Sequence, residues 1–311
     1  MVSAMCAYAL GKHLSDATQK QATIVFDALE NGPGEKKEIE GIVYQRMLCD
    51  TYKDGKSLSD TYLPTFKQLF SDLSKQSGIP HEIRFYKELQ ANPVARETLI
   101  TLLSEQNKFV PVLNPSDDRL KVRFKCPKCN YEEKHARTLE FSDHIPYEKI
   151  ALQNTCFEHG KYKIALEKNN KDFVDVNTMV RNVMKESVII NKSKKDNYFP
   201  LLIKGADWAH ATPLVSNALE MLGYSVDERP HHIFTPIVED WSGAKFSKSV
   251  YVESNTYNKL SKGFISYDNY LSEFGEKSFE NLFDHVCSWV KDPKKFYRNY
   301  SLEYMCGVCK I

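Results

Sequence analysis

Two lysines separated by small or flexible residues are the side chains best suited to phosphate chemistry. They are Lys245 and Lys248, in the segment 240–249 with the sequence DWSGAKFSKS. Ammonium groups on flexible stems act as mobile charges on the β- and γ-phosphates of a nucleotide. The hydroxyl of Ser247 and nearby backbone N–H groups can complete such a cradle. The segment predicts a loop that folds over a triphosphate, and a charged surface loop is the alternative.

A second polar element follows a short apolar run at 199–204 and has the sequence GADWAH, from Gly205 to His210. Ligands of open α/β sheets bind at the carboxyl ends of the strands. Glycine permits close backbone approach, and the Asp207 carboxylate can hold a ribose hydroxyl or a substrate amine. An N-capping Asp207 and a packed or solvent-facing His210 form the alternative interpretation.

Soft metal ligands occur in two pairs, a Cys-x-x-Cys and a Cys-x-x-His. These ligands are Cys126, Cys129, Cys156 and His159. Two such turns can present four ligands to a tetrahedral zinc ion, and a fully coordinated ion has a structural role. Free cysteines in an apolar β module are the alternative. Cys306 and Cys309 form only a half site, for which two reduced thiols are the simpler interpretation.

The composition limits the class of protein. Apolar residues make up 42 % of the 311 residues, enough for a sizeable core. The formal net charge is +1, which argues against a strongly basic coat for nucleic acid. No apolar run approaches the ~20 residues that span a bilayer, and no secretory signal is evident. Eight cysteines in so long a chain suggest a reducing compartment. We therefore expect a cytoplasmic protein without a membrane partner.

Periodicity predicts the elements that must position these residues. Helices are expected over 3–18, 35–50, 59–77, 92–106, 174–186 and 209–223. Strands are expected over 22–27, 199–204 and 232–238, and a loop over 111–118. Strand, helix and strand around Gly205 form a βαβ unit.

Four regions follow from this organisation. Residues 1–120 and 169–254 are expected to form two halves of an α/β, Rossmann-like nucleotide-binding core with a parallel sheet. Residues 121–168 are expected to be a β-rich zinc-binding insertion, and residues 255–311 a helical C-terminal region.

The segment Lys245 to Ser249 resembles the KMSKS signature of class I aminoacyl-tRNA synthetases, with Phe246 in place of Met. That family commonly has an Asp and a Gly before the signature, and Asp240 stands there in this chain. The 205–210 element resembles the Gly-x-Asp-x-x-His element that lines the family's adenylate pocket. The nearest likeness is to class I lysyl enzymes, which carry cysteine-rich zinc insertions and have an acid and an arginine where this chain has Asp175 and Arg181.

This resemblance implies a HUP-type fold, ATP with Mg²⁺, and an amino-acid-like substrate that is activated as its adenylate. Lysine is one candidate substrate, and tRNA stays open as a partner. The residues implied are Lys245, Ser247 and Lys248 for catalysis, and Gly205, Asp207, His210, Asp240 and Phe246 for nucleotide binding. Two alternatives stay open: a nucleotidyltransferase with a small-molecule acceptor, and a synthetase-derived binding protein without catalysis.

The chain departs from the family in two respects. The HIGH signature is not found, and His13 is its only N-terminal candidate. The segment 3–18 resembles the helix that follows that signature, so we expect the histidine turn either before residue 1 or lost. The region 255–311 is short for an anticodon-binding region. The amino acid, the acceptor and the oligomeric state stay open.

Overall fold

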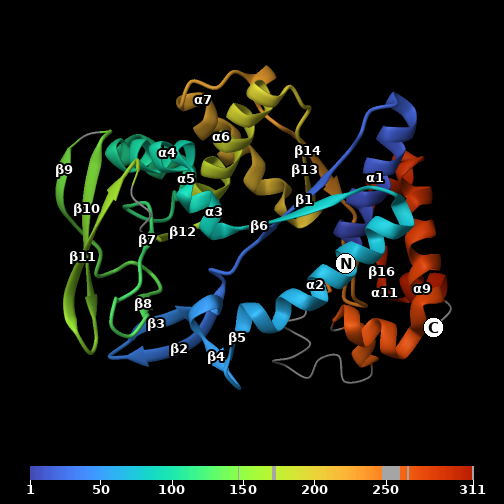
Figure 1. The fold of residues 1–311 in the computed structure, drawn as a ribbon, viewed down its shortest axis with the longest axis horizontal. Coiled ribbons are helices and arrows are strands. Elements are labelled where there is room, and N and C mark those ends of the chain that lie inside the picture. The colour runs from blue at the N-terminus through green and yellow to red at the C-terminus, as the bar shows by residue number, and fades with distance from the viewer. Residues whose placement is uncertain (146, 170–172, 247–259, 265, 310–311) are drawn as a thin grey trace.

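The chain has a mixed α/β fold with several small sheets in this computed structural model, which describes residues 1–145, 147–169, 173–246, 260–264 and 266–309 (Figure 1). The helices are α1 (Val2–Thr18), α2 (Leu58–Ser77), α3 (Tyr86–Ala91), α4 (Pro93–Ser104), α5 (Gln106–Leu113), α6 (Thr178–Asp196), α7 (Thr212–Met221), α9 (Tyr267–Val290), α10 (Pro293–Phe296) and α11 (Leu302–Cys309). Short 3₁₀ helices are η1 (Leu48–Asp50), η2 (Ala206–Ala211), η3 (Val226–Glu228) and η4 (Lys262–Phe264).

The strands pair into small sheets of both orientations. They are β1 (Ile24–Ala28), β2 (Pro33–Ile39), β3 (Ile42–Met47), β4 (Tyr52–Lys53), β5 (Lys56–Ser57), β6 (His81–Phe85), β7 (Val122–Arg123), β8 (Glu132–Glu133), β9 (Glu140–Ile145), β10 (Lys149–Cys156), β11 (Gly160–Glu167), β12 (Asp175–Val176), β13 (Leu201–Gly205), β14 (His231–Thr235), β15 (Val238–Glu239) and β16 (Tyr300–Ser301). The prediction of an α/β chain with parallel strands is confirmed at this level.

Two parallel strand pairs contain the three segments predicted as strands. β1 pairs with β6 from Ile24 opposite His81, and β13 pairs with β14 from Leu201 opposite His231. Both pairs combine β-branched and other apolar residues with polar and charged ones, and most of their residues are half-buried. Within the described residues the two pairs are separate sheets and do not form one continuous sheet.

Helix α1 packs against both pairs and runs antiparallel to them. Near its start, the hydroxyl of Ser3 lies 2.9 Å from that of Thr235, at the carboxyl end of β14. Further along, a Cβ at Gly11 would lie 3.5 Å from Ile24, at the amino end of β1. A helix in this direction that leads into a parallel strand has the geometry of a βαβ crossover.

The β-rich segment predicted over 121–168 contains the antiparallel sheet β9–β10–β11 and strand β8, which extends the β2–β3 hairpin. Along β10, buried and half-buried residues alternate, with Ile150, Leu152 and Cys156 on the buried side. This two-residue period is that of a strand with one face on a core.

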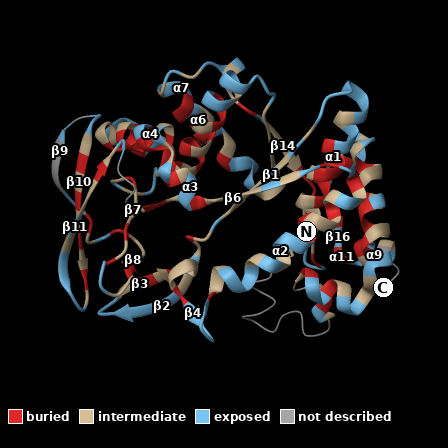
Figure 2. Cartoon of the chain, in the orientation of Figure 1, coloured by how far each residue is buried: buried red, intermediate tan, exposed pale blue. Residues whose placement is uncertain are grey.

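Two hydrophobic cores lie at opposite sides of the molecule (Figure 2). The first packs helices α4 to α7 against β10 and β11, so the β-rich segment shares its core with helices from both sides of it in sequence. The second gathers α1, α2, α9 and α11 around Trp289, whose ring stacks on Tyr300 at 4.1 Å.

Three predicted elements differ from the structure. The predicted helix over 35–50 is wrong, because β2 and β3 form a hairpin there with Glu40 and Gly41 at φ 51° and 76°. The predicted loop over 111–118 is wrong at its start, since α5 continues to Leu113. The predicted helix over 174–186 begins only at Thr178, so Asp175 lies in β12 and shares no helix face with Arg181.

Candidate functional site

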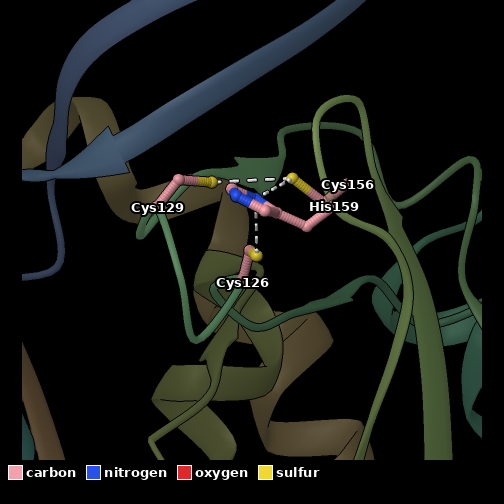
Figure 3. Close-up of side chains that lie close together, drawn as sticks. All are labelled: Cys126, Cys129, Cys156 and His159. Carbon is pink, nitrogen blue, oxygen red and sulfur yellow. Dashed lines mark hydrogen bonds between the residues drawn. The ribbon is translucent and has the colours of Figure 1, made fainter.

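The four predicted metal ligands lie together. The Cys156 sulfur lies 3.5 Å from both the Cys129 sulfur and the His159 Nδ1, and the Cys126 sulfur lies 3.6 Å from that nitrogen. All four ligand atoms lie within 4.8 Å of one another, and their side chains point toward a common centre (Figure 3).

Two tight turns present these ligands. In the first, Asn130 takes the left-handed conformation with φ 62°, and its N–H donates to the Cys126 carbonyl at 2.9 Å. In the second, β10 ends at Cys156 and β11 begins at Gly160, whose φ is +70°. Asn and Gly tolerate this conformation best, so the local sequence favours both turns.

The donor set suits a divalent metal ion such as zinc. Ligands bonded at about 2.3 Å to a tetrahedral ion lie about 3.7 Å apart, close to the shorter separations seen here. Burial and the neighbouring Cys156 thiol raise the pKa of Cys129. A bound cation would reverse this effect by stabilising the thiolate. The predicted group is therefore confirmed as one that can hold a metal.

Aromatic rings and an arginine connect the cysteine turns to strand β3. The Phe157 ring lies 4.8 Å from Tyr44 and 5.4 Å from Tyr131. Arg46 donates to the Cys129 carbonyl at 3.0 Å and lies over the Tyr131 ring. The metal group therefore sits where the β2–β3 hairpin meets the β10–β11 hairpin.

The second predicted site brings together segments 38 residues apart. The ammonium of Lys245 donates to the carboxylate of Asp207 at 2.5 Å. Both residues, with Phe246, line a cavity of about 590 Å³. The other walls come from the start of α1 and from α2, η4 and α9, including Met1, Ser3, Tyr62, Phe66, Phe264, Tyr267 and Tyr270.

Asp240 holds the loop that carries Lys245. Its carboxylate accepts from the backbone N–H and the hydroxyl of Ser242 at 2.9 and 2.6 Å. Its backbone N–H donates to the Ala244 carbonyl, and Gly243 supplies the positive φ of 77° that the turn needs. Asp240 is buried and is not among the residues that line the cavity, so in this structure it fixes the loop.

The remaining predicted residues divide between several places. A Cβ on Gly205 would lie 2.4 Å from the Asp207 carboxylate, so a side chain there would displace that carboxylate. His210 is exposed, with its ring 6.4 Å from Trp208, and is not among the residues that line the cavity. Ser247 and Lys248 lie outside the described residues.

A second cavity, of about 610 Å³, was not predicted from the sequence. Its walls come from the carboxyl ends of β1, β6 and β13 and from one face of α6. Asp27 pairs there with Arg84 at 2.9 Å and with Lys185 at 3.4 Å. The available signal was the helical spacing of cationic residues between 181 and 192.

Comparisons with known proteins add no assignment. No protein-family model matches the chain, and no curated protein matches it. Among the described helices, none combines the length and the apolar character needed to cross a bilayer. The function is therefore inferred from side-chain geometry and charge.

Proposed function

We propose that the cavity beside Asp207 and Lys245 binds ATP, and that the chain is a class I synthetase-like enzyme that forms an acyl adenylate. The observation that carries this proposal is the ion pair between Asp207 and Lys245, two residues that line a ligand-sized cavity. It joins the two segments whose sequences resemble the family's nucleotide-binding elements.

The arrangement of strands supports a Rossmann-like, HUP-type interpretation of the core. Asp27 and Arg84, near the carboxyl ends of β1 and β6, share one cavity with Lys204 and Gly205 at the carboxyl end of β13. Both parallel pairs therefore present the same end to the candidate sites, and α1 packs across both. Ligands of such folds bind at this end.

Lys245 has a direct role in the proposed reaction. Its ammonium exchanges the Asp207 carboxylate for the β- and γ-phosphates, which leaves Asp207 to accept hydrogen bonds from the ribose hydroxyls. An oxygen of the substrate carboxylate forms a bond to the α-phosphorus. The bond from that phosphorus to the α,β-bridging oxygen breaks, and its electron pair leaves on pyrophosphate. Lys245 stabilises the negative charge that accumulates there.

Other groups have supporting roles in this proposal. Phe246 and the start of α1 line the same cavity. In this proposal they exclude water from the bound nucleotide. Mg²⁺, when bound to the nucleotide, neutralises phosphate charge. Zinc at the cysteine turns is structural, since four protein ligands leave no open coordination position.

The test compares nucleotide binding with catalysis in one variant. Lys245→Gln should slow amino-acid-dependent exchange of pyrophosphate into ATP by about a hundredfold and weaken ATP binding by less than about tenfold, because its charge matters most in the transition state. Calorimetry gives the ATP affinity, and radioactive exchange gives the rate. The matched control, Lys53→Gln, changes an exposed lysine in the β4–β5 hairpin and should change neither quantity.

Three outcomes separate the alternatives. No binding of ATP to the wild-type chain would remove the proposal altogether. Binding without exchange for any amino acid would favour a nucleotidyltransferase with another acceptor, or a binding protein without catalysis. Exchange with one amino acid names the substrate, and transfer to tRNA is then tested with the matching tRNA.

A further inference from the structure

The 610 Å³ cavity lies beside the Gly205–Trp208 turn. It is distinct from the 590 Å³ cavity lined by Lys245, which is called the Lys245 cleft below. Gly205 and Trp208 line this cavity, whereas Asp207 between them lines the cleft. The volume falls within the range of small-molecule pockets, roughly 300–1,000 Å³. The walls include Phe85, Tyr86 and Trp208, so the cavity has apolar sides as well as charges.

One face of α6 supplies a row of polar and cationic side chains to the cavity. Thr178, Arg181, Lys185 and Lys192, with the apolar Ile189 before the last of them, recur at intervals of three or four residues, which places them on one side of a helix. A separate face of α6, with Val180, Val183, Met184 and Ile190, is buried in the first core. The cationic row therefore faces the carboxyl ends of β1, β6 and β13.

Positive charge exceeds negative charge along the cavity wall. Its lining contains five cationic side chains and two carboxylates. The cations are Arg84, Arg181, Lys185, Lys192 and Lys204, and the acids are Asp27 and Glu88. Asp27 already contacts both Arg84 and Lys185, and Lys204 contacts the buried Glu186 behind the wall at 3.3 Å.

Two of these cations, Arg181 and Lys192, have no carboxylate partner among the residues that the structure describes. Arg181 lies 5.9 Å over the Tyr86 ring and donates to the Thr178 hydroxyl, and neither it nor Lys192 forms an ion pair with another described residue. Burial lowers the pKa of Lys204, and the positive Lys185 acts in the same direction. An anion in the cavity would compensate this excess charge, because a concave surface lined mainly by positive charge attracts an anion.

We propose that this cavity binds a small organic acid with two carboxylates. Arg181 and Lys192 are eleven residues apart on α6, a rise of about 16 Å. The long side chains of both residues can contact one ligand that has two separated anionic groups. A compact anion with a single charged group would contact only one of the two side chains. A ligand with a cationic side chain, such as lysine, would add positive charge to a wall that already has an excess. The proposal does not depend on nucleotide chemistry.

Calorimetric titration of the full chain with L-glutamate, L-glutamine and L-lysine tests this charge preference. L-Glutamate should bind at least about tenfold more tightly than L-glutamine, which has the same shape but lacks the second carboxylate. L-Lysine should give no measurable binding. The glutamate affinity should fall with added salt, since exposed charges are screened.

A double variant and a matched control on the same helix locate the binding. Arg181→Gln with Lys192→Gln should weaken L-glutamate binding by about tenfold or more. Lys195→Gln removes an exposed lysine of α6 that does not line the cavity, and it should leave the affinity unchanged. Thermal melting of each variant checks that the fold is retained.

Three results would overturn the inference: no binding of L-glutamate, L-lysine binding as tightly as L-glutamate, or equal effects of Lys195→Gln and the double variant. ATP affinity is measured in a separate titration. A chain that binds ATP but not L-glutamate would contradict this inference and leave the proposed ATP site unaffected. A chain that binds L-glutamate but not ATP would support this inference and contradict the proposed ATP site.

Discussion

At the scale of single residues, the metal group has the most direct consequence. Cys156→Ser removes one of the four converging ligands at the end of β10. A structural zinc ion adds its binding energy to folding, so the variant should lose bound zinc and melt roughly 5–10 °C lower. Metal content by mass spectrometry and a thermal melt measure the two effects.

The control for this prediction is a cysteine outside the group. Cys49 is half-buried, and its sulfur lies 3.9 Å from the Asp50 carboxylate. Cys49→Ser should keep the zinc content and change the melting temperature by no more than a few degrees. A chelator should lower the melting temperature of the wild-type chain but not that of Cys156→Ser. Equal chelator sensitivity in both chains would show that the four residues hold no metal.

Sequence spacing predicted the two pairs of metal ligands, and strand order predicted that Lys245 and Asp207 would meet, whereas the ion pairs of the second cavity were missed. Cys126 and Cys129 sit on one short turn, so sequence spacing alone specifies their geometry. Lys245 meets Asp207 because each follows a strand, which βαβ topology anticipates. Arg84 and Lys185 belong to separate elements about a hundred residues apart. The sequence contains no pattern that predicts their ion pairs with Asp27.

At the scale of elements, the β2–β3 hairpin shows why the helix prediction over 35–50 failed. Glutamate and lysine have high helix propensity, which favoured a helix for this charged stretch. Cross-strand pairing overrides that propensity, with β8 pairing on the other edge of β3. Glu40 and Gly41 both take positive φ, as in the two-residue turns that match strand twist. The dipeptide Glu-Gly is a weak hairpin signal compared with Asn-Gly.

The turn predicts stability changes of opposite sign. Gly41→Ala places a Cβ at φ 76°, where the space is open but the backbone is strained, and should destabilise the chain by about 1 kcal/mol. Glu40→Asn puts a residue that tolerates φ 51° at the first position and should stabilise by about 0.5 kcal/mol. Urea unfolding measures both. Two changes of the same sign would contradict the assigned turn.

At the scale of the whole molecule, the two cores could not be predicted from sequence order. The second core joins α1, near the start of the chain, to α9 and α11 in its last fifth. The first core closes α4 over the β10–β11 hairpin and α6. Hydrophobic periodicity predicts that each helix has a buried face, but it does not predict which helix or strand packs against that face.

A cluster of buried polar side chains links segments that are far apart in the sequence. Asp175 accepts from Arg123 and from the Asn31 amide, the latter at 2.6 Å. Gln45 donates to Glu132 at 2.9 Å. These residues come from the chain after β1, from β3, β7 and β8, and from β12 just before α6. Burial disfavours the charged form of a carboxyl group, so the stability of a chain with a buried Glu132 is expected to depend on pH.

The predicted pH dependence follows from Glu132, whose pKa is raised from 4.5 to about 8 by burial and then by the negative charge of Asp175. The folded chain keeps a proton over this interval that the unfolded chain has lost, so stability falls as pH rises from about 4.5 to about 8. Glu132→Gln removes this titration. The difference in unfolding free energy between about pH 5.5 and about pH 8 should shrink by roughly 2–3 kcal/mol in urea titrations. Glu38→Gln, an exposed change on β2, should leave the wild-type difference intact, and a Glu132→Gln chain with that same difference would show that this carboxyl group does not titrate in the interval.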